Sequence, residues 1–387
     1  MSRVAIIGGG PAGLMCAIIA KRTSPELEIT VFEKNDIAST LLPTGGGRCN
    51  ITHIAEDVKS LAQNYPRGEK FLYGIFNRFF IQDTIEFFKT IGVETYVQPD
   101  GRVFPTTDKS LDVIFALKNE IKRLGITVIN KEVTDIKIRD NGYVIDNKYF
   151  EKLVLATGGK DNKLLHLSGH NIIPQKTAMF SFEIKEKFLL NAVGVSVRNV
   201  LAVSKLNNKK IEIDGDILFT HKGISGPIAY KTSSIFAQEN YSEENPIKIT
   251  LNFVGKELNL QKIFDENPQK GIITIVSSFI PKSLGAILLE NFGIDAAKKA
   301  CVINKAERDK INGFLTCFEI NAIAPVKGSG IVSAGGIDLK EINSKTMESK
   351  IHKNLYFCGE VINVDGLCGG YNLQNCWATG YVAGISI

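Results

Sequence analysis

The sequence predicts an α/β protein built on a parallel sheet, and three features near its start lead to that class. The apolar strand Val4–Ile7 runs directly into a glycine-rich turn at 8–13. An amphipathic stretch then follows from Ala12 to Lys21, as expected for a helix. A second strand, Glu28–Phe32, ends at Glu33. Strand, helix and strand in this order form the βαβ unit of a parallel sheet.

The glycine turn has the spacing of a dinucleotide-binding loop. Gly8 permits the tight turn, Gly10 lets the backbone approach a pyrophosphate, and Gly13 lets the helix pack closely on the strand. The pyrophosphate then lies at a helix N-terminus, where unpaired N–H groups favour an anion and Pro11 loses no hydrogen bond. Glu33 lies about twenty residues beyond the last glycine, where a carboxylate accepts hydrogen bonds from a ribose 2′-hydroxyl. The alternative is an ordinary strand-to-helix turn.

Length and composition indicate a soluble protein of more than one domain. The 387 residues suit two or three domains. The 46 basic and 41 acidic side chains are dispersed and give a net charge of +5, so nucleic-acid binding is not indicated. The seven cysteines include no C-x-x-C pair and no zinc-ligand spacing, which favours a reducing cytosol and no metal site. The apolar run 4–20 is interrupted by the glycine turn, so we expect no membrane span.

Hydrophobic periodicity predicts further elements after the first βαβ unit. Two helices are expected, over Lys70–Gly92 and Asp112–Leu124. Four strands are expected after them: Ile126–Ile129, Val133–Arg139, Tyr143–Asp146 and Lys152–Ala156. The last of these ends in Thr157, Gly158 and Gly159, which places a flexible turn at the end of a buried strand.

The middle of the chain changes character twice before the tail returns to the first pattern. The period is mostly two from Thr177 to Val254 and helical from Gly255 to Phe314, with helices expected around Leu284–Leu289 and over Ala296–Val302. A strand, Asn354–Cys358, and a helix, Asn372–Ala383, follow. We therefore expect a discontinuous first domain, 1–175 with 322–387, a β-rich insert at 176–254 and a helical subdomain at 255–321.

Five sequence blocks together resemble one family, the YhiN/BaiN-type FAD-dependent oxidoreductases, which are relatives of the glutathione-reductase-like flavoproteins. The blocks are GGGPAG at 8–13, TGGGRCNIT at 44–52, GRVFP at 101–105, FTHKGISGP at 219–227 and the long C-terminal block at 346–374. The resemblance implies a Rossmann-like FAD-binding domain of the three-layer ββα kind. It also implies that a β-barrel-like insert and a helical subdomain interrupt that domain.

The resemblance also implies which residues contact FAD. Gly359 and Glu360 match a second flavin signature at the pyrophosphate and ribitol, although a strand-end turn is the alternative. The segment at 369–373 would put a helix N-terminus beside the flavin pyrimidine, where the helix dipole stabilises the charge of the reduced ring. The backbone of Val133 would meet adenine, or the residue is a core strand position. The expected contacts are Gly8, Gly10, Pro11, Ala12, Gly13, Glu33, Lys34, Gly46, Gly47, Arg48, Cys49, Asn50, Val133, Thr157, Gly158, Gly159, Gly359, Glu360, Gly370, Asn372 and Leu373.

Three residues are candidates for catalysis, and each has a structural alternative. Cys49 is either a redox thiol or a small packed side chain, and it has no resolving partner for disulfide chemistry. His221 is either a proton donor near neutral pH or a hydrogen-bonded structural residue. Tyr371 either orients substrate or packs. Arg102 and Lys109 are candidates for binding an anionic substrate, with solvated surface charges as the alternative.

The resemblance implies NAD(P)H-dependent reduction of a small activated substrate, such as an enone, by hydride transfer through flavin N5. No second GxGxxG string is present, so NAD(P)H would be a transient electron donor. The alternatives are an amine-type oxidase that uses oxygen and a flavin-dependent RNA-acting factor, although the missing basic and aromatic patch argues against RNA. The block TGGGRCNITH departs from the serine-led, asparagine-ended form that is usual in the family. Such departures bear on substrate preference.

Overall fold

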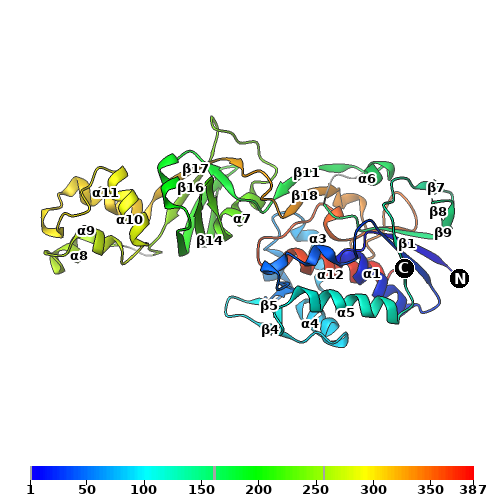
Figure 1. The fold of residues 1–387 in the computed structure, drawn as a ribbon. Coiled ribbons are helices and arrows are strands. Elements are labelled where there is room, and N and C mark those ends of the chain that lie inside the picture. The colour runs from blue at the N-terminus through cyan, green and yellow to red at the C-terminus, as the bar shows by residue number, and fades with distance from the viewer. Residues whose placement is uncertain (1, 160–162, 256–257) are drawn as a thin grey trace. The chain divides into compact units, whose positions relative to one another are not determined.

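A computed structural model gives the fold and describes residues 2–159, 163–255 and 258–387. The chain forms two compact units: Met1–Lys176 with Val332–Ile387, called unit 1, and Thr177–Ile331, called unit 2 (Figure 1). Unit 1 contains a five-stranded parallel sheet and unit 2 contains a closed six-stranded barrel, so the predicted α/β class with a barrel-like insert is confirmed. The division into three domains stays a prediction.

The strands of the sheet in unit 1 all run in the same direction, so their carboxyl ends lie at one edge of the sheet. Its order is β19-β10-β1-β2-β6, and every neighbouring pair is parallel. The register places Ile7 opposite Leu155 and Phe32, and Leu155 opposite Phe357. The strand order reverses between β1 and β10, which is where ligands bind in open parallel sheets. The strands are β1 (Arg3–Ile7), β2 (Glu28–Glu33), β6 (Thr127–Asn130), β10 (Lys152–Leu155) and β19 (Leu355–Phe357).

Two buried helices, α1 (Pro11–Thr23) and α12 (Tyr371–Gly384), pack side by side although they come from opposite ends of the chain (Figure 1). Small residues allow this close approach. A Cβ atom built at Gly380 would lie only 2.5 Å from the Ala12 carbonyl oxygen, and one at Gly384 would lie 2.9 Å from that of Cys16. The N-terminal βαβ unit and the C-terminal helix therefore form one core, as the discontinuous pattern in the sequence indicates.

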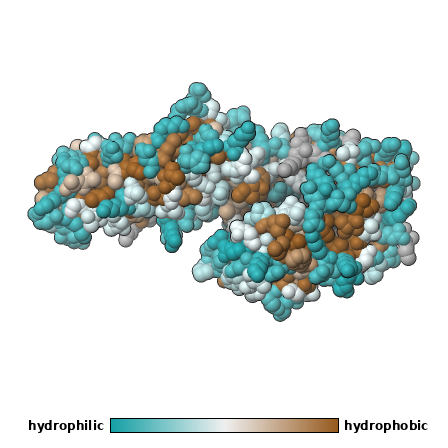
Figure 2. Space-filling model, in the orientation of Figure 1, coloured by the Kyte–Doolittle hydropathy of each residue, from teal (hydrophilic) through white to brown (hydrophobic). Residues whose placement is uncertain are grey.

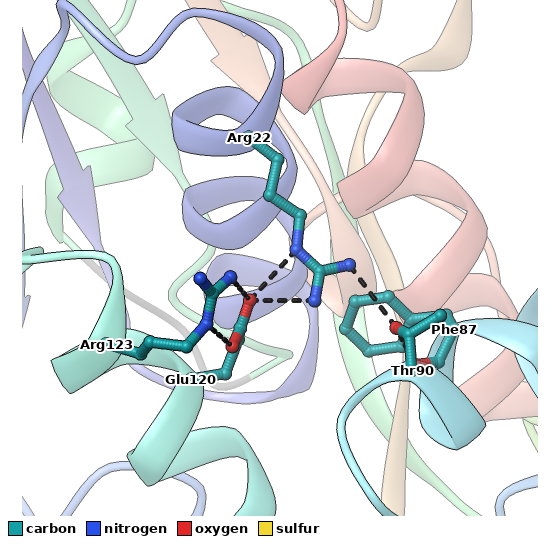
Figure 3. Close-up of polar contacts among 5 residues, drawn as sticks. All are labelled: Arg22, Phe87, Thr90, Glu120 and Arg123. Atoms are coloured by element: carbon teal, nitrogen blue, oxygen red, sulfur yellow. Dashed lines mark hydrogen bonds and ion pairs between the residues drawn. The ribbon is translucent and has the colours of Figure 1, made fainter.

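A charged cluster ties α1 to the neighbouring helices α4 (Ile81–Thr90) and α5 (Ser110–Arg123). The Glu120 carboxylate accepts hydrogen bonds from Nε of Arg123 at 2.7 Å and from Nε of Arg22 at 2.9 Å (Figure 3). The Arg22 guanidinium also lies over the Phe87 ring, 5.5 Å from its centroid, and donates to Thr90 Oγ1 at 3.5 Å. Glu120 is only 6% exposed, so this cluster fixes the helices from a largely buried position.

Three predicted elements differ from the observed ones, each for a local reason. The helix predicted over Lys70–Gly92 is two helices, α3 (Glu69–Phe76) and α4, because the Asp83 carboxylate accepts from Phe80 N–H and caps a new start. The strand predicted over Val133–Arg139 is regular only in β7 (Lys137–Arg139). The helix predicted over Ala296–Val302 is reduced to a 3-10 turn at 300–302, because Lys299 forms a β-bridge with Gly271.

The remaining elements of unit 1 surround the parallel sheet. An antiparallel sheet of order β3-β5-β4 follows the loop at 44–50, and it consists of β3 (Thr52–His53), β5 (Arg102–Pro105) and β4 (Thr95–Val97). A second one consists of β7, β8 (Gly142–Ile145) and β9 (Lys148–Phe150). The short helices are α2 (Val58–Ala62) and α6 (Lys163–Leu167), and β11 (Ile172–Ala178) pairs with β18 (Val332–Ile337).

Unit 2 is a barrel with attached helices. The barrel closes in the order β12 (Phe182–Ile184), β15 (Gly223–Ser225), β14 (Lys209–Thr220), β13 (Ser196–Leu206), β16 (Ile247–Asn252) and β17 (Phe318–Pro325). Because the barrel is closed, its sheet has no edge strand with a row of unpaired backbone N–H and C=O groups. The helices are α7 (Pro227–Ile235), α8 (Leu260–Glu266), α9 (Ile272–Val276), α10 (Lys282–Asn291) and α11 (Lys305–Thr316). Their apolar faces join the barrel interior in one buried cluster.

The visible surface of both units is mostly hydrophilic, with separate apolar patches between the polar side chains (Figure 2). Exposed apolar side chains include Leu111 and Phe115 on α5. No helix in the described part of the chain combines the length and apolar character that crossing a membrane requires.

Glu120→Gln should reduce the free energy of unfolding by about 1–3 kcal/mol at pH 7, because it removes the anion that the two arginines contact. Hydrogen bonds from Arg123, and then from Arg22, hold the pKa of the Glu120 carboxyl below its usual value, although burial opposes them. The stabilisation is therefore complete above the unfolded-state pKa of about 4.3 and is lost as the pH falls through the lower folded-state value.

Urea unfolding of both proteins at pH 7 and near pH 3 measures this effect, and the difference between them should shrink at acidic pH. The exposed Glu28→Gln is the matched control and should change stability little at either pH. Equal stability of wild type and Glu120→Gln at pH 7 would show that the cluster contributes nothing.

Candidate functional site

The glycine loop at the end of β1 packs closely against neighbouring backbone, because its glycines have no side chains. Gly8 has φ +109°, and a Cβ there would lie 2.2 Å from the Ala156 carbonyl oxygen. A Cβ at Gly13 would lie 2.0 Å from the Gly8 carbonyl oxygen, so α1 packs onto the loop only without a side chain. Gly10 differs, because the nearest atom to a Cβ there is Thr40 Oγ1 at 3.8 Å. The loop is therefore closed at Gly8 and Gly13 and open in front of Gly10.

The start of α1 offers unpaired donors beside that opening. Gly10 is the N-cap and makes no side-chain cap, and Pro11 and Ala12 begin the helix. The first N–H groups of a helix have no partner within it, and they attract an anion. Gly10 and the helix N-terminus therefore form the kind of cradle that a pyrophosphate fits.

Glu33 holds the loop as well as ending β2. Its Oε2 accepts from Gly9 N–H at 2.7 Å and its Oε1 accepts from Asn35 N–H at 2.9 Å. The neighbouring Lys34 forms an exposed ion pair with Glu132 at 3.1 Å, a contact of little energetic weight. Val133 follows β6 and is buried in the core cluster. The carboxylate is therefore already oriented by the backbone, and its remaining lone pairs are what a ribose hydroxyl would use.

The turns after β10 and β19 lie against the glycine loop. A Cβ at Gly359 would lie 2.7 Å from Ala12 Cβ, and one at Gly159 would lie 2.9 Å from a Glu360 carboxylate oxygen. No atom of the described residues lies within 4 Å of a Cβ built at Gly158. The Thr157 hydroxyl is buried, and it has no hydrogen-bond partner among the residues that the structure describes. The ends of three neighbouring strands thus converge with the start of α1.

Glu360 changes charge near neutral pH. Burial, and after it the nearby Asp365 charge, raises the pKa of its carboxyl to about 7, although the hydrogen bond from Gly159 N–H lowers it. Asp365 is fully buried and hydrogen-bonded through both oxygens to the Arg67 guanidinium. Burial raises the pKa of Asp365 as well, and Arg67 lowers it. A buried ion pair therefore sits beside a carboxyl that is readily protonated.

The loop at 44–50 lies beside the N-terminus of α12. A Cβ at Gly370, which caps this helix, would lie 2.7 Å from the Thr52 carbonyl oxygen and 3.0 Å from Asn50 Oδ1. The Asn50 Oδ1 atom is buried and has no hydrogen-bond partner within the described residues. Gly46 and Gly47 are exposed at the front of this loop. Arg48 stacks on Phe104, with its guanidinium carbon 4.1 Å from the ring centroid.

Residues predicted in the first turn of α12 have structural roles in the fold. Asn372 closes a turn by accepting from Gly366 N–H and donating to its carbonyl, both at 2.8 Å. Leu373 packs against the core of unit 1. Tyr371 is 8% exposed, and its carbonyl accepts from the Tyr65 hydroxyl at 2.6 Å. These contacts set the position of the helix N-terminus.

The two other candidate catalytic residues have different surroundings. Cys49 is fully buried, and burial raises the pKa of its thiol to about 12 although the Thr44 hydroxyl lowers it. It is therefore a neutral thiol at pH 7, which favours the packed alternative. His221 is exposed in the turn between β14 and β15 and belongs to unit 2, whereas the predicted dinucleotide contacts belong to unit 1.

Several polar residues at this site were not predicted from the sequence. Gln374 and Asn375 on α12 are fully buried, and Gln374 Oε1 accepts from Thr52 and Thr84 hydroxyls at 2.7 and 2.8 Å. Its Nε2 and both amide atoms of Asn375 have no hydrogen-bond partner in the described parts of the chain. Arg67 was also missed, because its partner lies 298 positions away. The sequence did contain one signal for Gln374 and Asn375, because they are polar residues within an otherwise apolar helix.

The arrangement fits an extended dinucleotide. It offers two helix N-termini without side-chain caps, an open cradle at Gly10 and buried polar atoms that have no hydrogen-bond partner among the described residues. Within residues 2–159, 163–255 and 258–387, no group of three or more His, Cys, Asp or Glu side chains is placed to hold a metal ion.

Comparison with known proteins gives consistent results. A family model described as "HI0933-like protein Rossmann domain" matches residues 2–386. The chain is 30% identical to a 3-dehydro-bile acid delta(4,6)-reductase of Clostridium scindens, over 99% of this chain and 98% of that protein. It is 29% identical to a ribosomal RNA dihydrouridine synthase of Haemophilus influenzae, over 99% and 97%. Among solved structures, quinol fumarate reductase FrdA of Escherichia coli is similar, with 16% identity, coverage of 100% and 70%, and a TM-score of 0.46.

Gly10→Val should abolish FAD binding without unfolding the protein. Gly10 has φ −79°, and the nearest atom to a Cβ there is Thr40 Oγ1 at an ordinary contact distance of 3.8 Å, so the fold should tolerate valine, which would obstruct a pyrophosphate. FAD content of purified protein and thermal unfolding measure the two effects. Gly74→Val, at an open position in α3, is the matched control and should retain FAD. A Gly10→Val protein that purifies with full FAD would place the pyrophosphate elsewhere.

Cys49→Ser should leave the rate of flavin reduction within about twofold of wild type, because a buried neutral thiol does not react as a nucleophile. Rapid-mixing absorbance with NADPH measures that rate at equal FAD content. The exposed Cys317→Ser controls for nonspecific effects of losing a thiol. Turnover lost while FAD and its reduction are retained would instead assign Cys49 a catalytic role.

Proposed function

Because the chain belongs to the HI0933-like family of Rossmann flavoproteins, we propose that it is an FAD-dependent reductase that saturates a carbon–carbon double bond conjugated to a carbonyl group. It is a flavoprotein oxidoreductase with an FAD-binding Rossmann fold. The observation that carries the proposal is the convergence of three strand ends and two uncapped helix N-termini in unit 1.

The described residues support binding of an extended FAD, with different residues contacting different parts of the cofactor. Gly10 and the N-terminus of α1 would bind the pyrophosphate, and Glu33 would accept from the adenosine ribose. The N-terminus of α12 and the loop at 44–50 would hold the flavin ring. FAD, when reduced, supplies the hydride. The protein then contributes binding, orientation and the positive end of the α12 dipole.

The names of the two relatives support this reaction class. A delta(4,6)-reductase of a 3-dehydro-bile acid acts on double bonds of a steroid that carries a ketone, and a dihydrouridine synthase forms a base with two hydrogens more than uridine. In both kinds of substrate the double bond is conjugated to a carbonyl. We therefore propose the shared chemistry, a hydride to one carbon and a proton to the other.

The ribosomal RNA relative gives a second candidate substrate, a uridine within RNA. It aligns over 99% of this chain at 29% identity, against 30% for the bile-acid reductase, so similarity alone does not rank the two. The small net charge of +5 supports the small-molecule substrate. Retardation of ribosomal RNA on a gel, weakened by salt, would instead support the RNA substrate.

We propose NAD(P)H as the electron donor. With no second GxGxxG string, the nicotinamide would bind transiently rather than in a Rossmann domain of its own. A rival proposal is an oxidase that passes electrons from an amine to oxygen. It predicts rapid reoxidation by oxygen with release of peroxide.

Purified protein should carry an oxidised-flavin spectrum that NADPH or NADH bleaches under anaerobic conditions. Adding 2-cyclohexen-1-one, a simple enone, should then restore the oxidised spectrum faster than buffer alone. The Gly10→Val protein, supplied with free FAD at the same concentration, is the control for chemistry in solution. A flavin that nicotinamides do not bleach, or that only oxygen reoxidises, would contradict the reductase proposal.

A further inference from the structure

His53 occupies a position in unit 1 that the family motifs leave without a role. It forms β3 with Thr52, directly after the loop at 44–50, and it pairs with Arg102 of β5 in an antiparallel register. The Thr52 carbonyl oxygen lies against Gly370, the N-cap of α12. His53 therefore lies between the two segments proposed to hold the flavin ring.

The imidazole ring is held in one orientation. Its Nδ1 lies 3.0 Å from the Gly369 carbonyl oxygen, which only accepts, so Nδ1 carries a hydrogen. The ring stacks on Tyr371, with centroids 4.8 Å apart and planes at 26°. The Tyr65 hydroxyl in turn fixes the Tyr371 backbone. Because Nδ1–H donates to a backbone carbonyl oxygen, the proton that the ring gains or loses is the one on Nε2.

Gly101, the first residue of the GRVFP motif, accommodates the Nε2 side of the ring. Its φ is +85°, and a Cβ built there would lie 2.7 Å from His53 Nε2. Any other residue at 101 would be strained and would displace the imidazole. The GRVFP motif thus sets the position of the His53 imidazole, because Gly101 lies against the ring and β5, which follows Gly101, pairs with β3.

Asp100 and Arg102, which form an ion pair at 2.7 Å, lie near this ring, and Tyr371 of α12 stacks on it. Burial raises the pKa of Asp100, but hydrogen bonds and charge from Arg102, with the charge of His53, lower it more. Asp100 is therefore an anion at neutral pH, and its carboxylate lies near the His53 ring. The ring is only partly buried, so it exchanges protons with water.

We infer that His53 donates, from Nε2, the proton that completes reduction of the conjugated double bond. The inference rests on the proposed function. FAD, when bound and reduced, would supply a hydride to the carbon distal to the carbonyl, and the π electrons of the double bond would move to the carbon next to the carbonyl. His53 gives its Nε2 proton to that carbon and becomes a neutral imidazole. Water would then restore the proton to Nε2, and the flavin would stay bound in its oxidised form.

His53→Asn is the sharpest test, because asparagine is the residue that usually ends this block in the family and its Nδ2 can keep the donor to Gly369. It removes only the titratable nitrogen. Reduction by NADPH should be unchanged, and anaerobic reoxidation by 2-cyclohexen-1-one should slow by about 10²-fold near neutral pH. The wild-type reoxidation rate should fall as the pH rises through the imidazole pKa, whereas the variant rate should not vary over that range.

A second measurement is independent of turnover. The His53 imidazole NMR signal of apoprotein should shift when oxidised FAD is added, and the exposed His166 signal should not. His166→Asn is the matched kinetic control. If His53→Asn fails to fold, His53→Gln takes its place, with FAD content as the check.

Different results would contradict the proposed reductase function and the proposed role of His53. If wild-type flavin is not reoxidised by the enone, the proposed function is wrong, whatever His53 does. If wild type is reoxidised and His53→Asn matches it in rate and pH dependence, His53 is not the proton donor. An unshifted His53 signal on FAD binding would likewise place the ring away from the flavin and overturn the inference.

Discussion

The site depends on one packing constraint, the contact of α1 with the carboxyl edge of the parallel sheet. Gly13 lies against the Gly8 carbonyl and Gly8 lies against that of Ala156, with no room for a Cβ atom at either glycine. This contact fixes the N-terminus of α1 above the point where the strand order reverses. Because β10 and β19 end in the same register as β1, their turns reach the same place. The dinucleotide cradle follows from this packing.

The second half of the site depends on ties between distant segments. The Arg67–Asp365 ion pair, the bond from Tyr65 to the Tyr371 carbonyl and the bond from Leu367 N–H to the Asn64 carbonyl join the 64–67 segment to the loop before α12. A buried ion pair gives little net stability, but losing one partner leaves an uncompensated charge. Its effect here is positional, because it helps to hold the N-terminus of α12 beside the loop at 44–50. The Asp365 charge also adds to burial in raising the pKa of Glu360.

The sequence predicted the local parts of this site well and the long-range parts poorly. The βαβ unit, the strand before 157–159 and the C-terminal helix were predictable because each has its own period and turn residues. The break between α3 and α4 depends on one capping carboxylate, Asp83, that periodicity does not register. The sequence distinguishes His53 only as a departure from the asparagine-ended form of its block, and that departure assigns it no role. Its role arises from Gly101 and Gly369, which are 48 and 316 positions away.

The most direct test of the central claim is a crystal structure of the protein with FAD bound. The account predicts that the pyrophosphate accepts hydrogen bonds from backbone N–H groups at the start of α1, in front of Gly10. It also predicts that the flavin ring lies between the loop at 44–50 and the N-terminus of α12. A pyrophosphate bound elsewhere, with the space in front of Gly10 filled only by water, would contradict it.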